Sequence, residues 1–320
     1  MRLLPLLAGV LFCAVFAAAG SSHPVALNYA SPSWSPDGRQ LVFVSAFGPS
    51  GQVLLARADG RNIRPIARAA LVTRVVWSPD GLRIAYVSRG EIFVVRRDGS
   101  GRVRVGSGAG VAWSPDSTKL AFDSGWKGPI RVVGSDGGGA HVVADGAYDR
   151  APAWSPDGQR LVFSRADAPG ARASLYVVGV DGSGLRALGI QGADPSWSPD
   201  GSRLAFWLNT RDGVALATTT LDGFGVVVTR SLPAYSGPAR WSPDGTKLAF
   251  TPCGEFGACR VDVAAADASF VTILGSGAEP VWSPDGTRVA FTARRFCRTS
   301  SIFTIGAGGE RLSRLTPCRR

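Results

Sequence analysis

The chain has 320 residues, of which 41 are Gly and 21 are Pro, and it carries a formal net charge of +11. It contains only 4 Glu, 3 Lys and 1 Met, so it lacks the residues that favour exposed helices, and a helical bundle is excluded. Apolar content of 45% and charged content of 18% are typical of a globular chain rather than a disordered one. Two His leave little material for a multi-His metal site or a Ser-His-Asp triad.

The first residues have the pattern of a secretory signal peptide. A basic second residue precedes an apolar stretch over residues 3–16, and residues 17–19 are all Ala, which fits a small-residue cleavage site. We predict a signal peptide over residues 1–21 and one exported domain over residues 22–320, either secreted or periplasmic. An uncleaved anchor is the alternative, which Pro5 disfavours because it interrupts the apolar run. We expect no integral membrane span after cleavage.

A pentapeptide, Trp-Ser-Pro-Asp-Gly, recurs along the rest of the chain every 36 to 44 residues. Six copies are complete, and one copy ends in Ser instead of Gly. The copies begin at Trp34, Trp77, Trp113, Trp154, Trp197, Trp241 and Trp282. A period of this length indicates a repeat architecture. The repeats start near Ser31, Arg74, Gly110, Ala151, Asp194, Pro238 and Glu279.

Each repeat reads as four short strands. Ser-Pro-Asp-Gly favours a tight turn, because Pro presets φ, Ser and Asp bond the local backbone, and Gly accepts a positive φ. An apolar triplet such as residues 41–43 follows the turn, and five repeats later carry Asp-Gly, a strong hairpin signal. Four strands in about 40 residues are the size of one propeller blade. We therefore predict an all-β fold, a seven-bladed β-propeller of four-stranded antiparallel blades, with the repeated Trp packed between blades.

These motifs resemble those of the TolB family of WD-repeat-like β-propellers. The resemblance rests on the Trp-Ser-Pro-Asp-Gly turn, the apolar-Ala-Phe triplet and the Asp-Gly hairpin, and it extends over residues 30–316. It implies the propeller fold but no particular function, because one fold hosts many functions. TolB itself has an additional N-terminal domain, for which residues 22–33 leave no room. The resemblance therefore implies a propeller without that domain.

The strand order of a propeller places two kinds of loop on opposite faces. The Ser-Pro-Asp-Gly turns and the Asp-Gly hairpins share one face, whereas the variable loops share the other with the entries to the inner strands. Variable loops on a rigid repeat are where binding usually resides. The mouth of the central channel on that face is predicted to present Tyr29, Arg74, Asp149, Arg150, Asp194, Tyr235 and Glu279. Their mixed charge suits a polar peptide or a sugar, and the alternative is that they are solvated rim residues.

Four Cys remain after signal cleavage, and an oxidising compartment predicts disulfides. Cys253 and Cys259 flank the variable loop of the sixth repeat. Cys297 lies in the equivalent loop of the seventh repeat, and Cys318 follows the last strand on the same face. We predict the pairs Cys253–Cys259 and Cys297–Cys318, the second helping to seal the ring. A structural zinc is the alternative, but no CxxC spacing supports it. Whether residues 25–29 add a strand to the last blade stays open.

Function is less constrained than fold. Turn bonding explains the repeated Asp better than calcium does, and we expect no metal and no cofactor. Arg is scattered over all repeats without a dense stripe, which argues against nucleic acid as a partner. We predict a monomeric, non-enzymatic scaffold that binds an envelope protein or a cell-wall glycan. The alternative is a lyase or hydrolase for a polysaccharide or another small polar substrate, with Asp149, Asp194 and Glu279 as its carboxylates.

Overall fold

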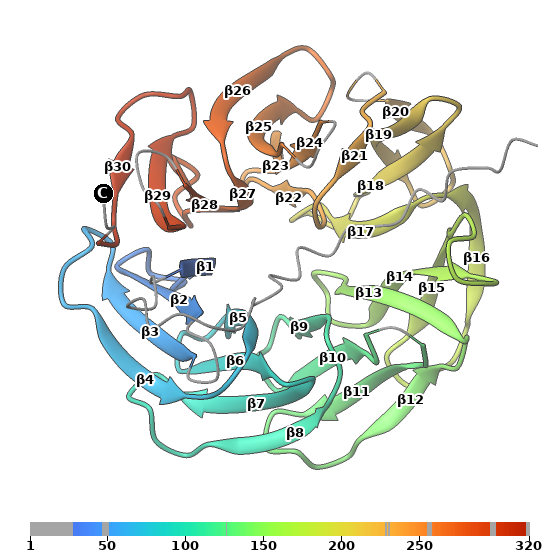
Figure 1. Cartoon of the computed structure of the whole chain (residues 1–320). Coiled ribbons are helices and arrows are strands. Elements are labelled where there is room, and N and C mark those ends of the chain that lie inside the picture. The colour runs from blue at the N-terminus through green and yellow to red at the C-terminus, as the bar shows by residue number, and fades with distance from the viewer. Residues whose placement is uncertain are drawn as a thin grey trace, which may run out of the picture.

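The computed structural model describes residues 28–46, 51–125, 127–227, 229, 231–254, 258–294 and 299–317. They form seven four-stranded antiparallel sheets arranged in a ring, which confirms the predicted seven-bladed propeller (Figure 1). In every blade the strands follow chain order from the axis outward, and the described part of the chain contains no helix.

Each blade is built from one continuous segment of chain. The first three blades comprise β1 (Asn28–Trp34), β2 (Gln40–Ala46), β3 (Gln52–Arg57), β4 (Arg64–Arg68), β5 (Val72–Trp77), β6 (Arg83–Ser88), β7 (Glu91–Arg96), β8 (Val103–Ser107), β9 (Val111–Trp113), β10 (Lys119–Asp123), β11 (Ile130–Gly134) and β12 (His141–Ala144). The next two comprise β13 (Tyr148–Trp154), β14 (Arg160–Ala166), β15 (Ser174–Gly179), β16 (Arg186–Gln191), β17 (Ala193–Trp197), β18 (Arg203–Thr210), β19 (Gly213–Thr220) and β20 (Gly225–Val227). The last two comprise β22 (Arg240–Trp241), β23 (Lys247–Phe250), β25 (Arg260–Ala265), β26 (Val271–Ser276), β27 (Ala278–Trp282), β28 (Arg288–Ala293), β29 (Ser301–Gly306) and β30 (Ser313–Arg314). A separate two-stranded sheet joins β21 (Ala234–Tyr235) to β24 (Pro252–Cys253).

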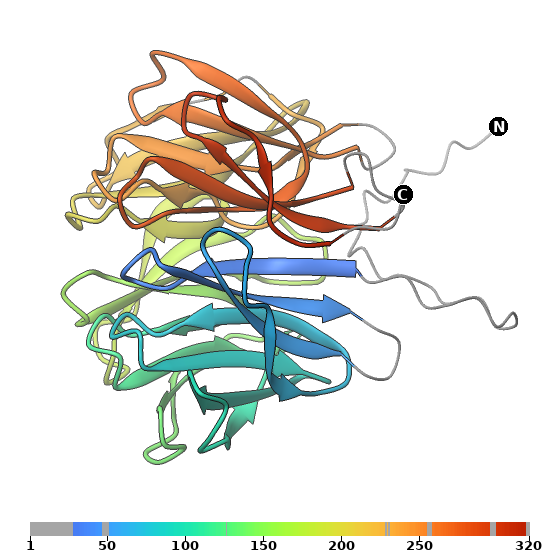
Figure 2. The same cartoon turned by 90° about the vertical axis from the view of Figure 1, so that its left-hand side faces the viewer.

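The ring has two unlike faces, because the strands run from one face to the other (Figure 2). Turns between the first and second strands and between the third and fourth strands of each blade share one face, which we call the turn face. Connections between the second and third strands, and those between blades, share the opposite face, which we call the loop face. The antiparallel order of every sheet dictates this division.

The Ser-Pro-Asp turns on the turn face satisfy their own polar groups. In the first copy Ser35 Oγ donates to the Asp37 carboxylate at 2.6 Å and accepts the Gln40 amide at 2.9 Å. Asp37 also accepts the Arg39 amide at 3.0 Å. The other six copies repeat these bonds. The repeated Ser and Asp are therefore explained by turn formation, as predicted.

These turns give the protein a predictable sensitivity to acid. Six turn carboxyls have pKa values held below the usual range, first by the Ser hydroxyl that donates to each, namely Asp37, Asp116, Asp157, Asp200, Asp244 and Asp285. For Asp200 the pKa falls to about 2. A depressed folded-state pKa stabilises the fold above the unfolded pKa, and that stability is lost as pH falls through the folded pKa.

We therefore expect the melting temperature to fall steeply between about pH 4 and about pH 2. Circular dichroism melts across that interval measure the effect. The Asp200→Asn variant serves as the control, because it removes one of the titrating groups and should show a shallower fall. A melting temperature that stays constant down to about pH 2 would contradict this explanation.

The seven repeated Trp lie between blades, as predicted. Their exposed fractions are only 5–9%, and each packs against the preceding blade, as Trp77 does against Val42 and Val44. Four indole N–H groups also donate to the preceding blade, for example from Trp282 to the Arg240 carbonyl at 2.9 Å. The core clusters of the described residues combine side chains from two neighbouring blades. Each blade therefore needs its neighbours to bury the faces of its sheet.

Arg residues contribute to the same interfaces. An Arg six positions after a repeated Trp places its guanidinium 5.0–5.5 Å from the ring of the Trp in the next blade, within the range of a cation–π contact. The four pairs are Arg83 with Trp113, Arg160 with Trp197, Arg203 with Trp241, and Arg288 with Trp34. Part of the Arg excess therefore belongs to the scaffold.

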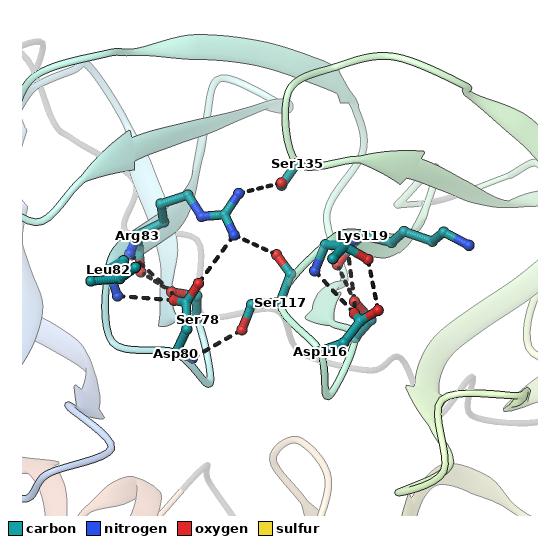
Figure 3. A network of polar contacts seen from close by, with 10 residues as sticks. Ser78, Asp80, Leu82, Arg83, Asp116, Ser117, Lys119 and Ser135 are labelled. Carbon is teal, nitrogen blue, oxygen red and sulfur yellow. Dashed lines mark hydrogen bonds and ion pairs between the residues drawn. The ribbon is translucent and has the colours of Figure 1, made fainter.

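Arg83 illustrates how such an interface is completed (Figure 3). Its guanidinium donates to Ser135 Oγ, to the Ser117 carbonyl at 2.8 Å and to Asp80 at 3.1 Å. Ser117 replaces the Gly of the other copies and adopts a φ of 62°. Its hydroxyl accepts the Asp80 amide of the preceding blade at 2.9 Å, a bond that Gly would not make. The Ser that replaces Gly at position 117 therefore links the second and third blades.

The ring closes by packing rather than by strand exchange within the described residues. Strand β1 is the inner strand of the first blade, and β30 is the outer strand of the last. Tyr29, Trp34 and other side chains of the first blade form one core cluster with Ala290, Ile302 and Leu315 of the seventh. The Tyr29 amide also donates to the Ser300 carbonyl at 3.1 Å.

Candidate functional site

Two of the predicted binding residues are held by scaffold contacts. Tyr29 is only 4% exposed and meets Phe43 edge-on at 5.7 Å, within the seam between the first and last blades. Asp149 is 2% exposed and accepts two bonds from Arg165, at 2.6 and 2.7 Å. It also accepts the Gly146 amide at 2.8 Å. Tyr29 therefore packs at the seam of the ring, and Asp149 forms an ion pair within the fourth blade.

The other predicted residues include a group of polar side chains around the axis, which we call the axial cluster. It comprises Arg74, Asp194, Tyr235, Arg240 and Glu279. They belong to the inner strands of four blades or, for Tyr235, to the adjoining two-stranded sheet. Four are half-buried and Glu279 is exposed, so solvent reaches each of them. The Arg150 charge also acts on Asp194.

Sequence reasoning missed Arg240. It directly precedes Trp241, whereas most of the predicted residues lie three or more positions before a repeated Trp. The sequence did contain a signal for Arg240, because it is the one charged residue at this position. In the other six repeats the residue before the Trp is Ser, Val or Ala. A charged side chain at a position that is otherwise small or apolar indicates a local function.

Backbone bulges set the direction of two side chains of the axial cluster. Asp194 and Glu279 each precede a Pro and adopt φ values of 50° and 57°, in the left-handed region that non-Gly residues rarely enter. The register of the inner strand shifts at both positions. Bulges of this kind re-aim side chains and are common beside functional sites. Glu279 thereby accepts the Ser31 amide of the first blade at 2.8 Å and Thr292 Oγ1 at 3.0 Å.

A disulfide-closed loop supports Tyr235. The predicted bond between Cys253 and Cys259 is present, with the two sulfurs 2.01 Å apart. Cys253 belongs to β24, which pairs with β21 so that Pro252 lies opposite Tyr235. The other predicted pair, Cys297–Cys318, lies outside the described residues.

The ring of Tyr235 stacks on Trp207 with centroids 4.4 Å apart. Trp207 lies outside the repeated motif, is 1% exposed and donates its indole N–H to the Gly237 carbonyl at 3.0 Å. The loop pairing and this stack fix the ring from two sides, so the hydroxyl of Tyr235 is held toward Asp194, to which it donates a hydrogen bond.

Charges in the axial cluster perturb one another. Burial raises the pKa of Asp194 above its usual range, although the Tyr235 hydrogen bond and the Arg74 charge act in the opposite direction. Burial, the Asp194 charge and the hydrogen bond together raise the pKa of Tyr235, which keeps it a hydrogen-bond donor. Burial first, and then repulsion by Arg74, lower the pKa of Arg240 to about 10. Arg240 therefore remains charged at neutral pH.

The chemistry available in the axial cluster is that of polar recognition. It offers guanidinium donors, carboxylate acceptors and a Tyr hydroxyl on a rigid frame. No group of three or more His, Cys, Asp or Glu in the described ranges is arranged to hold a metal ion. No helix among the described residues is long and apolar enough to cross a bilayer.

Comparisons with known proteins agree with this architecture. The family model of the TolB β-propeller domain matches residues 22–194. The Tol-Pal system protein TolB of Anaeromyxobacter dehalogenans (strain 2CP-C) is 36% identical over 89 residues, which are 27% of this chain and 20% of that relative. The match thus spans a fifth of the length of this relative.

Solved structures share the fold at low identity. An oligogalacturonate lyase from Vibrio parahaemolyticus superposes with a TM-score of 0.69 at 16% identity, over 88% of this chain and 91% of that one. The β-propeller domain of the Trilobed protease from Pyrococcus furiosus, described as having an open velcro topology, gives 0.64 at 16% identity over 92% and 99%. The family match covers more than half of the chain, which therefore belongs to the TolB β-propeller domain family.

Proposed function

We propose that the protein is an exported scaffold of the cell envelope that binds an envelope protein or a cell-wall glycan through its loop face. The contrast between the two faces carries the proposal. Seven nearly identical turns on the turn face bond their own Ser and Asp side chains, whereas polar and charged side chains gather around the axis among the blade entries. Polar groups that are not used by the scaffold are available to a ligand.

Two matched double variants test which face binds. Arg172 and Arg211 are exposed on the loop face, and Arg39 and Arg61 are exposed on the turn face. Capture from envelope extract by the purified chain should be lost in Arg172→Glu/Arg211→Glu and retained in Arg39→Glu/Arg61→Glu, which changes the net charge equally. Equal loss in both variants would assign capture to net charge, and loss only in the second would assign it to the turn face.

A second function, a lyase or hydrolase for a polysaccharide or another small polar substrate, is favoured by Asp194. A carboxyl with a raised pKa beside a Tyr and two Arg is typical of acid–base sites. A screen of acidic and neutral polysaccharides detects it. Turnover that is abolished in Asp194→Asn and retained in Arg39→Glu/Arg61→Glu would replace the scaffold function with catalysis.

A further inference from the structure

Two guanidinium groups of the axial cluster have no carboxylate of the described residues in ion-pair contact, although the charges of Asp194 and Glu279 act on Arg240 from farther away. Arg74 lies three residues before Trp77 in the second blade, and Arg240 directly precedes Trp241 in the sixth. Neither takes part in an ion pair within the described ranges, whereas Arg165 and Arg260 each contact a buried carboxylate at 2.6 and 2.9 Å. A half-buried cation without a contacting carboxylate is only partly compensated, and a ligand that supplies a negative charge in direct contact would stabilise it further.

The nearby carboxylates already have partners. Asp194 accepts the Tyr235 hydroxyl, and Glu279 accepts the Ser31 amide and Thr292 Oγ1. Burial, and then the like charge of Arg74, lower the pKa of Arg240, and the charges of Asp194 and Glu279 offset this only in part. Two blades on different sides of the ring thus present like charges to one another, an arrangement that an anion placed between them would relieve.

We propose that Arg74 and Arg240 bind the carboxylate of a small hydroxylated ligand, which has the chemistry of a sugar acid. A planar guanidinium matches a carboxylate with two parallel hydrogen bonds. The oxygens of Asp194, Tyr235 and Glu279 beside the two Arg accept hydrogen bonds from hydroxyl groups. The proposal rests on the proposed function, because it names the chemistry that the loop face recognises at its centre.

A protein partner at this centre fits less well. Cores of protein–protein interfaces are depleted of charge and rich in aromatic and other apolar side chains. Among the described residues, only Leu71 is a large exposed apolar side chain on the loop face. The others lie on outer strands or on the turn face, namely Leu82, Val142, Leu185, Phe224, Phe270, Val271 and Ile273.

Calorimetric titration of the purified full chain tests the proposal. The probes are glucuronate, glucose, inorganic phosphate and tetraglutamate. We expect glucuronate to bind, and Arg74→Gln and Arg240→Gln each to weaken its affinity about tenfold or more, because each removes a charge-assisted hydrogen bond. The control Arg39→Gln removes the same charge from the turn face and should leave the affinity unchanged. Glucose, which lacks the carboxylate, should not bind.

Several outcomes would overturn the proposal. These are glucose binding as tightly as glucuronate, equal effects of the axial and control variants, and tighter binding of phosphate or of tetraglutamate. Melting temperatures without ligand provide a second measurement, because removal of an unpaired cation should leave the fold as stable as before or more stable. A marked fall in both axial variants would assign the two Arg a structural role instead. If glucuronate does not bind but the chain still captures its partner from envelope extract, the sugar-acid site is wrong. The proposed scaffold function would then remain supported.

Discussion

Replacing Asp149 with Ala is expected to lower the free energy of unfolding by about 3–5 kcal/mol, because it leaves a charged Arg165 without its partner. The Asp149 side chain is fully buried, and that of Arg165 is 19% exposed. The substitution also deprives the Gly146 amide of its acceptor. The Arg165 guanidinium also lies 4.8 Å from the ring of Tyr176, a contact that it would lose by turning to solvent. Denaturant unfolding followed by Trp fluorescence measures the loss.

The exposed Asp167, two residues beyond Arg165, provides the matched control. Asp167→Ala should change the stability by no more than about 0.5 kcal/mol. The double variant Asp149→Ala/Arg165→Met should recover much of the loss, because it removes the charge together with its partner. If Asp149→Ala is as stable as the control, the ion pair does not hold the fourth blade together. Loss of ligand binding in Asp149→Ala alone would accordingly report on folding as much as on recognition.

Replacing Ile302 with Ala is expected to lower the free energy of unfolding by about 2–5 kcal/mol, because it leaves a cavity at the seam of the ring. Ile302 is fully buried in β29 and shares a core cluster with Trp34, Leu41 and Phe43 of the first blade. Within the described residues no strand passes between these two blades, so packing carries the closure. Thermal and denaturant unfolding both report the change.

Ile273→Ala is the matched control, because it makes the same substitution at a residue that lies away from the seam. It lies on the outer strand β26 with 61% exposure, so Ile273→Ala should alter stability by no more than about 0.5 kcal/mol. Equal stability of the two variants would show that packing at the seam does not limit the stability of the fold.

Local sequence was sufficient to predict the blades. The turn bonds of Ser35 and Asp37 reach no farther than the backbone amide of Gln40, so the pentapeptide supplies every side chain that its own turn needs. The same holds for the disulfide between Cys253 and Cys259, which closes a short loop within one blade. The partner of Asp149 was also within reach, because the register of β13 and β14 places Arg165 directly opposite it.

The axial cluster was predicted only in part. Arg74, Asp194, Tyr235 and Glu279 were recognised as polar residues near the entries to the inner strands, but Tyr29 and Asp149 had the same pattern and turned out to be packed into the scaffold. The difference depends on whether a buried partner lies beside the side chain, and such a partner comes from another strand or another blade. The position of one residue within its repeat does not show whether such a partner lies beside it.

The sequence by itself determined the number of blades, their strand order, the two unlike faces and the disulfide Cys253–Cys259, since each depends on contacts within about 40 residues. Only the tertiary structure decided that Arg residues stack on the Trp of the next blade, that the first and last blades meet by packing, and that the charges of Arg74 and Arg240 act on one another near the axis. Those features arise when the chain closes into a ring, because closure brings the second and sixth blades to one axis although they are distant in sequence.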